Sequence, residues 1–132
     1  IDKSSHGKII KYSELILRNY ITHSSVMVNT KLFKKILFET DSALIGFEDY
    51  YAYLKYIFFY GPGYRIGDSL VEYRKSSDSL GEKIDVSERF VKSLYTILKL
   101  SIDIGDFRSV FLPTLYRIAI FLKINFMRIF FK

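Results

Sequence analysis

The residues best placed to do chemistry are the adjacent pair Glu48 and Asp49, within the stretch GFEDYYAYLK at 46–55. The pair follows a glycine and a phenylalanine and precedes an aromatic-rich run. Acidic residues in the first turn of a helix favourably meet the positive end of its dipole, for about 0.3–1 kcal/mol each. A carboxylate held at such a position also stays ionised and can take a proton from a substrate. From this pair alone, both a helix-capping role and a chemical role are open.

Length and composition restrict the chemistry available. The chain has 132 residues, half of them apolar, which is enough for one domain with a hydrophobic core. It has no cysteine, which excludes disulfides and thiolate metal sites and fits a reducing compartment. His6 and His23 are its only histidines, so we expect no metal site from its own residues. The chain begins with isoleucine and shows no signal-peptide pattern, so we expect a fragment of a longer protein.

The hydrophobic pattern predicts the elements that position the acidic pair. Apolar residues three and four apart predict a helix that opens at the pair and ends at the Gly-Pro-Gly of 61–63. Its core stripe is expected to be Phe47, Tyr50, Tyr51, Leu54, Ile57 and Phe58. A second face carries Asp49, Tyr53, Tyr56 and Tyr60. Before this helix, a short buried strand is predicted over 24–28 and a helix over 30–39, capped by Thr30.

The second half of the chain is predicted to end in two helices. Short strands over 64–67 and 69–74 are expected to form a hairpin through Gly67–Asp68. Asp85 and Glu88 fit a capping pattern for a helix over 85–102 that Gly105 ends, and a last helix is expected to start at Pro113. We place a domain boundary near residue 83. A compact mixed part, 1–83, precedes it, and a helical tail, 84–132, follows.

Three motifs in order resemble a known family. NYITHSSVMVNTKLF, GFEDYYAYLKYIFFYG and IGDSLVEYRKSSDS lie within residues 19–79. Together they resemble the second half of the catalytic domain of family 2 glycosyltransferases, which have the A-type nucleotide-sugar-binding fold. The shared features are a small-residue pair before apolar residues, an acidic pair opening a helix, and a strand ending in Tyr-Arg before a serine-rich loop. The resemblance implies that the complete domain has an α/β fold. This chain would be its helix-rich C-terminal half, which taken alone is α+β with a few short strands.

The resemblance also implies roles for six residues. It makes Asp49 the base that takes the proton of the acceptor hydroxyl, and Glu48 a residue that supports it or contacts the acceptor. The residues implied to bind substrate are Arg74, Tyr53, His23 and Ser25. Each of these four also has a structural interpretation: an exposed arginine at a strand end, a packed tyrosine, and a histidine and a serine in local hydrogen bonds.

The complete enzyme is expected to transfer a sugar, with inversion, from a nucleotide-sugar donor to a hydroxyl of a glycan or lipid-linked acceptor. Bacterial surface polysaccharide synthesis is the implied setting, in the cytoplasm and peripheral on the inner face of the membrane. The family holds a divalent metal, Mn²⁺ or Mg²⁺, with an Asp-Xaa-Asp motif in its first half, and no such triplet occurs here. We therefore expect the metal and the nucleotide to bind outside this chain, and the chain alone to be inactive.

The tail after Asp106 has five basic residues and no acidic one. On a helical wheel of 109–132 one narrow polar arc holds Thr114, Arg117, Asn125, Arg128 and Lys132. The other positions are apolar apart from Lys123, a pattern typical of a helix in the membrane interface with its basic side toward anionic headgroups. A helix packed against a partner chain or the missing half would explain it equally well. Exposed apolar surface of this kind also predicts self-association.

Functions of two other classes are compatible with the same sequence. The first alternative is a non-catalytic helical module that docks on a membrane or a partner chain. The second, a nucleic-acid binder, rests only on the net charge of +6. The basic residues are spread among apolar ones rather than clustered, so we expect no nucleic-acid partner.

Overall fold

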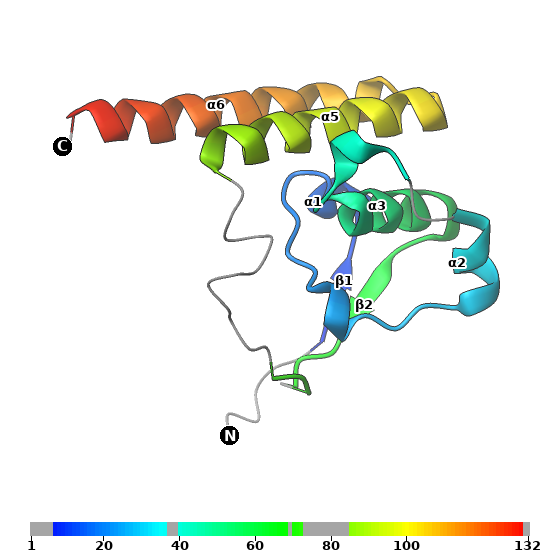
Figure 1. Cartoon of the computed structure of the whole chain (residues 1–132). Helices are drawn as coiled ribbons and strands as arrows, with labels where there is room; N and C mark the ends of the chain where they lie inside the picture. The colour runs from blue at the N-terminus through cyan, green and yellow to red at the C-terminus, as the bar shows by residue number, and fades with distance from the viewer. Residues whose placement is uncertain (1–6, 37–39, 69, 73–84, 131–132) are drawn as a thin grey trace.

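The computed structural model describes residues 7–36, 40–68, 70–72 and 85–130, with side chains as far as Met127 (Figure 1). Its α-helices are α1 (Tyr12–Leu15), α2 (Thr30–Ile36), α3 (Glu48–Tyr60), α5 (Val86–Ile104) and α6 (Arg108–Phe130). Two 3₁₀ turns are η1 (His23–Ser25) and η2 (Ser42–Leu44). The strands β1 (Lys8–Ile10) and β2 (Gly63–Arg65) pair antiparallel, with Ile9 opposite Tyr64. The chain is thus helix-rich with a small sheet, which confirms the mixed α+β class.

Helix α3 is the centre of the fold, and its bounds are those predicted. It begins at Glu48 and ends before Gly61, whose φ of 94° lies in the region that favours glycine. The buried residues of α3 are Tyr50, Tyr51, Ala52, Tyr53, Leu54 and Ile57. The helix therefore buries more than the predicted stripe, because Tyr53 of the second face also packs inside, whereas Phe58 is partly exposed. Its neighbours in the core include Leu15, Leu44, Ile97 and Leu100.

Two predictions of strands are wrong among the described residues. Residues 24 and 25 belong to η1, and 26–28 have no regular structure, with Met27 96% exposed. No strand lies alongside this segment in the described part of the chain, so its apolar residues are not covered as a buried strand would be. The predicted strand 64–67 overlaps β2, but the hairpin through Gly67–Asp68 is wrong, because β2 pairs with β1 and 70–72 form no strand. Residues 69, 73 and 74 of the other predicted strand lie outside the described residues.

The helix termini follow local capping groups. Helix α2 starts at Thr30, but the cap is Asn29, whose side-chain oxygen accepts from the backbone N–H groups of Lys31 and Leu32. Asp85 caps α5 as predicted, accepting from Ser87 N and Glu88 N, and Gly105 ends that helix with a left-handed φ of 71°. The predicted start of α6 is wrong. The helix begins at Arg108 rather than Pro113, because Asp106 accepts from Ser109 N and opens the helix earlier.

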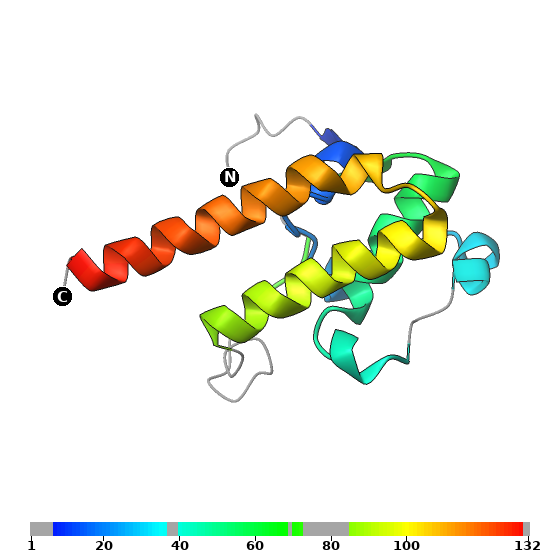
Figure 2. The same cartoon turned by 90° about the horizontal axis from the view of Figure 1, so that it is seen from above.

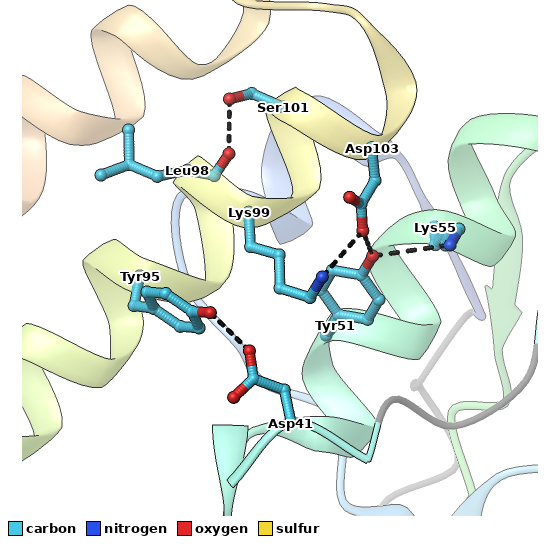
Figure 3. A network of polar contacts seen from close by, with 8 residues as sticks. All are labelled: Asp41, Tyr51, Lys55, Tyr95, Leu98, Lys99, Ser101 and Asp103. Atoms are coloured by element: carbon cyan, nitrogen blue, oxygen red, sulfur yellow. Dashed lines mark hydrogen bonds and ion pairs between the residues drawn. The ribbon is translucent and has the colours of Figure 1, made fainter. Parts of the chain in front are cut away.

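A polar network holds α5 on α3 (Figure 3). The Tyr51 hydroxyl of α3 donates to the Asp103 carboxylate of α5, and Lys99 lies 3.3 Å from the same carboxylate. Partial burial alone would raise the pKa of Asp103, but the hydrogen bonds from Tyr51 and Lys99 outweigh it and hold that pKa below its usual range. Farther along α5, the Tyr95 hydroxyl donates to Asp41, just before η2.

Helix α6 lies against α5 and runs past its end in both views (Figures 1 and 2). The Phe90 ring of α5 stacks on Phe121 of α6, with centroids 4.1 Å apart. Arg117 points from α6 into the body of the domain, where it donates to Ile16 O at 2.8 Å and to the Tyr50 hydroxyl at 2.6 Å. The polar arc was predicted to face anionic headgroups, and this is wrong at Arg117. Its guanidinium turns inward instead, because Ile16 O and the Tyr50 hydroxyl are polar groups of the body that accept its hydrogen bonds.

Helix α5 shares its hydrophobic cluster with the first part of the chain. Ile97, Leu100 and Val110 pack in the same cluster as Leu15 and Leu54. The boundary predicted near residue 83 falls in 73–84, outside the described residues. The division into two domains stays a prediction.

Asp103→Asn should destabilise the protein in a pH-dependent way. A carboxylate whose pKa is lowered by folding stabilises the folded state above its unfolded pKa and loses that contribution as the pH falls through the folded value. We expect the free energy of unfolding to fall by about 1 kcal/mol at pH 7. The difference should shrink below about pH 4, the ordinary range for aspartate. Urea unfolding at pH 7 and pH 3 measures both values.

Asp68→Asn is the control, because this carboxylate is exposed in the bend after β2. It should change the free energy of unfolding by less than about 0.5 kcal/mol. An equal loss for Asp103→Asn at both pH values would contradict the electrostatic role of Asp103.

Candidate functional site

The start of α3 faces a hollow that two distant segments of the chain help to form. The hollow has a volume of about 420 Å³ and is lined by His23, Gly46, Glu48 and Asp49. This volume lies within the range of small-ligand sites, about 300–1,000 Å³. Gly46 makes the turn into α3 with a φ of 84°, a conformation that residues with a side chain adopt rarely. Three of the residues predicted to be functional, at 23, 48 and 49, therefore share one concave surface.

Asp49 is partly buried in the first turn of α3. Its Oδ1 accepts a hydrogen bond from Tyr50 N at 2.6 Å, so this carboxylate does bind a backbone N–H group of the helix start. Burial nevertheless raises the pKa of Asp49 above its usual value, and neighbouring Glu48 raises it further. The Tyr50 N–H group and the nearby His23 act in the opposite direction without reversing the shift. Asp49 thus combines a fixed position with the increased basicity that a general base needs.

One carboxylate oxygen of Glu48 receives no hydrogen bond from the described residues. Its Oε2 is buried and has no hydrogen-bond partner among the described residues. An unpaired buried acceptor costs about 1–3 kcal/mol. Because Glu48 also lines the hollow, a hydroxyl or amine group bound there could donate to this oxygen.

His23 is held against α3 by Tyr53. Its Nδ1 shares a hydrogen bond of 2.7 Å with the Tyr53 hydroxyl, and the two rings stack with centroids 6.1 Å apart. Burial raises the pKa of Tyr53 to about 12, with a further contribution from the charge of Asp49. The ring is only 4% exposed and packs against Phe33 of α2, so it cannot lie flat against a sugar. Tyr53 therefore positions His23 at the hollow.

Of the two remaining predicted residues, Ser25 is not among the described residues that line the hollow. The Ser25 hydroxyl donates to Thr22 O at 2.7 Å and so closes the local turn of η1. Arg74 lies outside the described residues, and its predicted contact with phosphate stays a prediction. The lining residue that sequence reasoning missed is Gly46, whose position directly before the acidic pair was the available signal.

The lining suits a neutral, hydroxyl-rich ligand rather than a metal or a phosphate. No cluster of three or more His, Asp or Glu side chains that could hold a metal ion occurs among the described residues. The two carboxylates would repel a diphosphate, and no arginine or lysine among the described residues lines the hollow. Carboxylates that accept from hydroxyl groups, with one able to take a proton, fit an acceptor alcohol.

The stability effect of Asp49→Asn separates a helix cap from a reactive carboxylate. A carboxylate whose pKa is raised by folding loses stability as the pH rises through the folded value, so its ionised form carries a cost at pH 7. Asparagine removes that cost and still offers an oxygen to Tyr50 N. We expect a higher melting temperature at pH 7 and no difference below about pH 3.5, where the carboxyl group is protonated.

Asp41→Asn is a control of opposite sign. Hydrogen bonds from the Tyr95 hydroxyl and Ala43 N hold the pKa of Asp41 below its usual range, so its ionised form stabilises the fold. Its replacement should lower the melting temperature at pH 7. A similar decrease for Asp49→Asn would show that Asp49 acts chiefly as a helix cap.

Comparison with known proteins gives no match to this chain among family models, curated proteins or solved structures. The resemblance to family 2 glycosyltransferases therefore depends on the three ordered motifs and on the residues gathered at the start of α3. No family is assigned to the chain, and its function is a proposal.

Proposed function

We propose that this chain is the acceptor-side half of an inverting glycosyltransferase resembling family 2. The observation that carries the proposal is the Asp49 carboxylate, which burial makes more basic and which shares a hollow with Glu48 and His23. The complete enzyme moves a sugar from a nucleotide-sugar donor to a hydroxyl of a glycan or lipid-linked acceptor. Assembly of bacterial surface polysaccharide, on the cytoplasmic side of the membrane, is the process we propose for it.

The reaction is a single displacement at the anomeric carbon of the donor sugar. An acceptor hydroxyl in the hollow donates its proton to Asp49, and its oxygen forms the new bond to the anomeric carbon. The bond from that carbon to the phosphate oxygen breaks, and the nucleoside diphosphate leaves with the electron pair. Attack from the side opposite the leaving group inverts the configuration. The raised pKa of Asp49 brings it nearer to the working pH, which improves a general base.

Glu48 and His23 orient the acceptor in this proposal. The unpaired Oε2 of Glu48 accepts from a second hydroxyl of the acceptor, which replaces the donor that the protein does not supply. His23, fixed by the Tyr53 hydroxyl, borders the same space. Holding the acceptor oxygen close to its base can substantially lower the activation free energy of such a reaction.

The metal ligands and most of the nucleotide site are proposed to lie outside this chain. Within the described residues, the lining of the hollow includes no cation for a diphosphate and no metal cluster. Arg74 is proposed to meet the charge of the diphosphate, since a guanidinium matches phosphate oxygens in a bidentate way. No step of the proposed reaction at Asp49 requires a metal ligand from this chain.

A second candidate function is a non-catalytic module that docks on a membrane or a partner chain. It is favoured by the large exposed apolar residues along α6, which glycosyl transfer does not require. The two candidates differ in what they require of Asp49, because a docking module has no need of a basic carboxylate at α3.

Turnover of the complete enzyme should depend on Asp49. Asp49→Asn keeps the size of the side chain and the acceptor for Tyr50 N, but it removes the proton-accepting charge. We expect turnover to fall by about 10²–10⁴-fold, the usual worth of a general base, with donor binding retained. Glu48→Gln should cost less. The measurement is release of nucleoside diphosphate from a panel of nucleotide sugars with glycan acceptors.

Asp85→Asn is the matched control, because Asp85 caps α5 with the same kind of hydrogen bonds and lines no part of the hollow. It should leave turnover unchanged. Near-normal turnover of a folded Asp49→Asn enzyme would overturn the proposal and favour the docking module.

A further inference from the structure

Helices α5 and α6 together present one apolar surface directed away from the rest of the domain. We call it the outer face. Its residues are Val91, Leu98 and Ile102 of α5 and Phe111, Leu115 and Leu122 of α6, all of them exposed. In each helix these residues recur at helical spacing on one side, whereas Ile97 and Leu100 of α5 point into the core. Figure 2 looks onto this two-helix layer from above, with the rest of the domain behind it.

On the outer face, apolar side chains are exposed where a surface helix of a water-soluble protein exposes polar ones. Such a helix turns its polar side to water and its apolar side to the core. In α6 the guanidinium of Arg117 is directed inward to Ile16 O and the Tyr50 hydroxyl, while Leu122 is 62% exposed. On α5, Ile102 is 67% exposed. Contiguous apolar surface contributed by two helices marks a site where another apolar phase is bound.

We propose that the outer face binds to the surface of an anionic lipid bilayer, with α5 and α6 lying in the plane of the membrane. Charge is the reason to choose lipid. After Asp106 the chain has no acidic residue, and besides the inward-directed Arg117 it has four basic residues, which complement anionic headgroups. Arg108 and Lys123 are both exposed on α6. A second copy would instead bring together two chains of net charge +6.

The contacts of Arg117 determine that the helix lies on the membrane and does not cross it. Arg108–Met127 is long and apolar enough to span a bilayer, with a mean hydropathy of 1.4. Arg117 lies near the middle of that stretch, and its partners Ile16 and Tyr50 belong to the folded body. A crossing helix would carry this body into the hydrocarbon layer or break both hydrogen bonds, and either change is costly.

Vesicle binding by the whole chain tests the proposal. The chain should co-sediment with vesicles of phosphatidylcholine and phosphatidylglycerol, less with phosphatidylcholine alone, and less as salt is added. Leu122→Glu should weaken binding roughly tenfold or more, because it removes a buried leucine from the lipid. Met27→Glu is the matched control: it adds the same charge at a residue that is 96% exposed on the loop before α2. It should reduce binding much less.

The orientation of the helices can be read with single tryptophans, because the chain has none. Brominated lipids should quench tryptophan placed at Leu122 and at Ile102, and should not quench tryptophan at Met27. Circular dichroism of each variant checks that it is folded. Equal loss for Leu122→Glu and Met27→Glu would overturn the proposal, as would quenching at residue 122 without residue 102. A dimer in solution that does not bind vesicles would assign the outer face to a second copy.

Discussion

The hydrogen bonds between Tyr50 and Arg117 are the interaction on which the rest of the structure depends. Tyr50 lies in the first turn of α3 and is only 1% exposed, and a buried hydroxyl needs partners. It donates toward Leu15 O and Ile16 O and accepts from Arg117. Burial raises the pKa of Tyr50 to about 12, although the charge of Arg117 acts to lower it. One hydroxyl and one guanidinium thereby join α1, α3 and α6.

The contact between Tyr50 and Arg117 helps to place both proposed functional surfaces, the hollow at the start of α3 and the outer face of α5 and α6. Asp49 directly precedes Tyr50, so fixing Tyr50 also fixes the first turn of α3, where Asp49 and Glu48 border the hollow. On α6, directing Arg117 into the body leaves the apolar residues of the helix outside. The proposed catalytic carboxylate and the proposed membrane face are thus held by the same buried contact, which would keep the acceptor hollow at a constant orientation to the lipid surface.

The predictable parts of the fold were those with local signals. Gly61 ends α3 and Asp85 opens α5, because a cap acts within a few residues of the helix end. The strand predicted over 24–28 failed because a strand needs a partner, and partners are non-local: β1 pairs with β2 across the whole of α3. Of the site, the acidic pair could be predicted from the sequence. The hydrogen bond between His23 and Tyr53 could not, because residue spacing does not show which distant side chains meet. A helical wheel showed a polar arc on α6 but not which side of the helix faces the body.

The central claim is that Tyr50 and Arg117 are energetically coupled across the core. A double-mutant cycle with Tyr50→Phe and Arg117→Met tests it, since methionine retains much of the apolar stem and phenylalanine retains the ring. The measurement is the free energy of unfolding in urea for the wild type, both single variants and the double variant. The account predicts a coupling energy of about 1–2 kcal/mol, within the range for residues that share a hydrogen-bond network. Losses that add to within about 0.5 kcal/mol would contradict it, because they would show that α6 is held in place by other contacts.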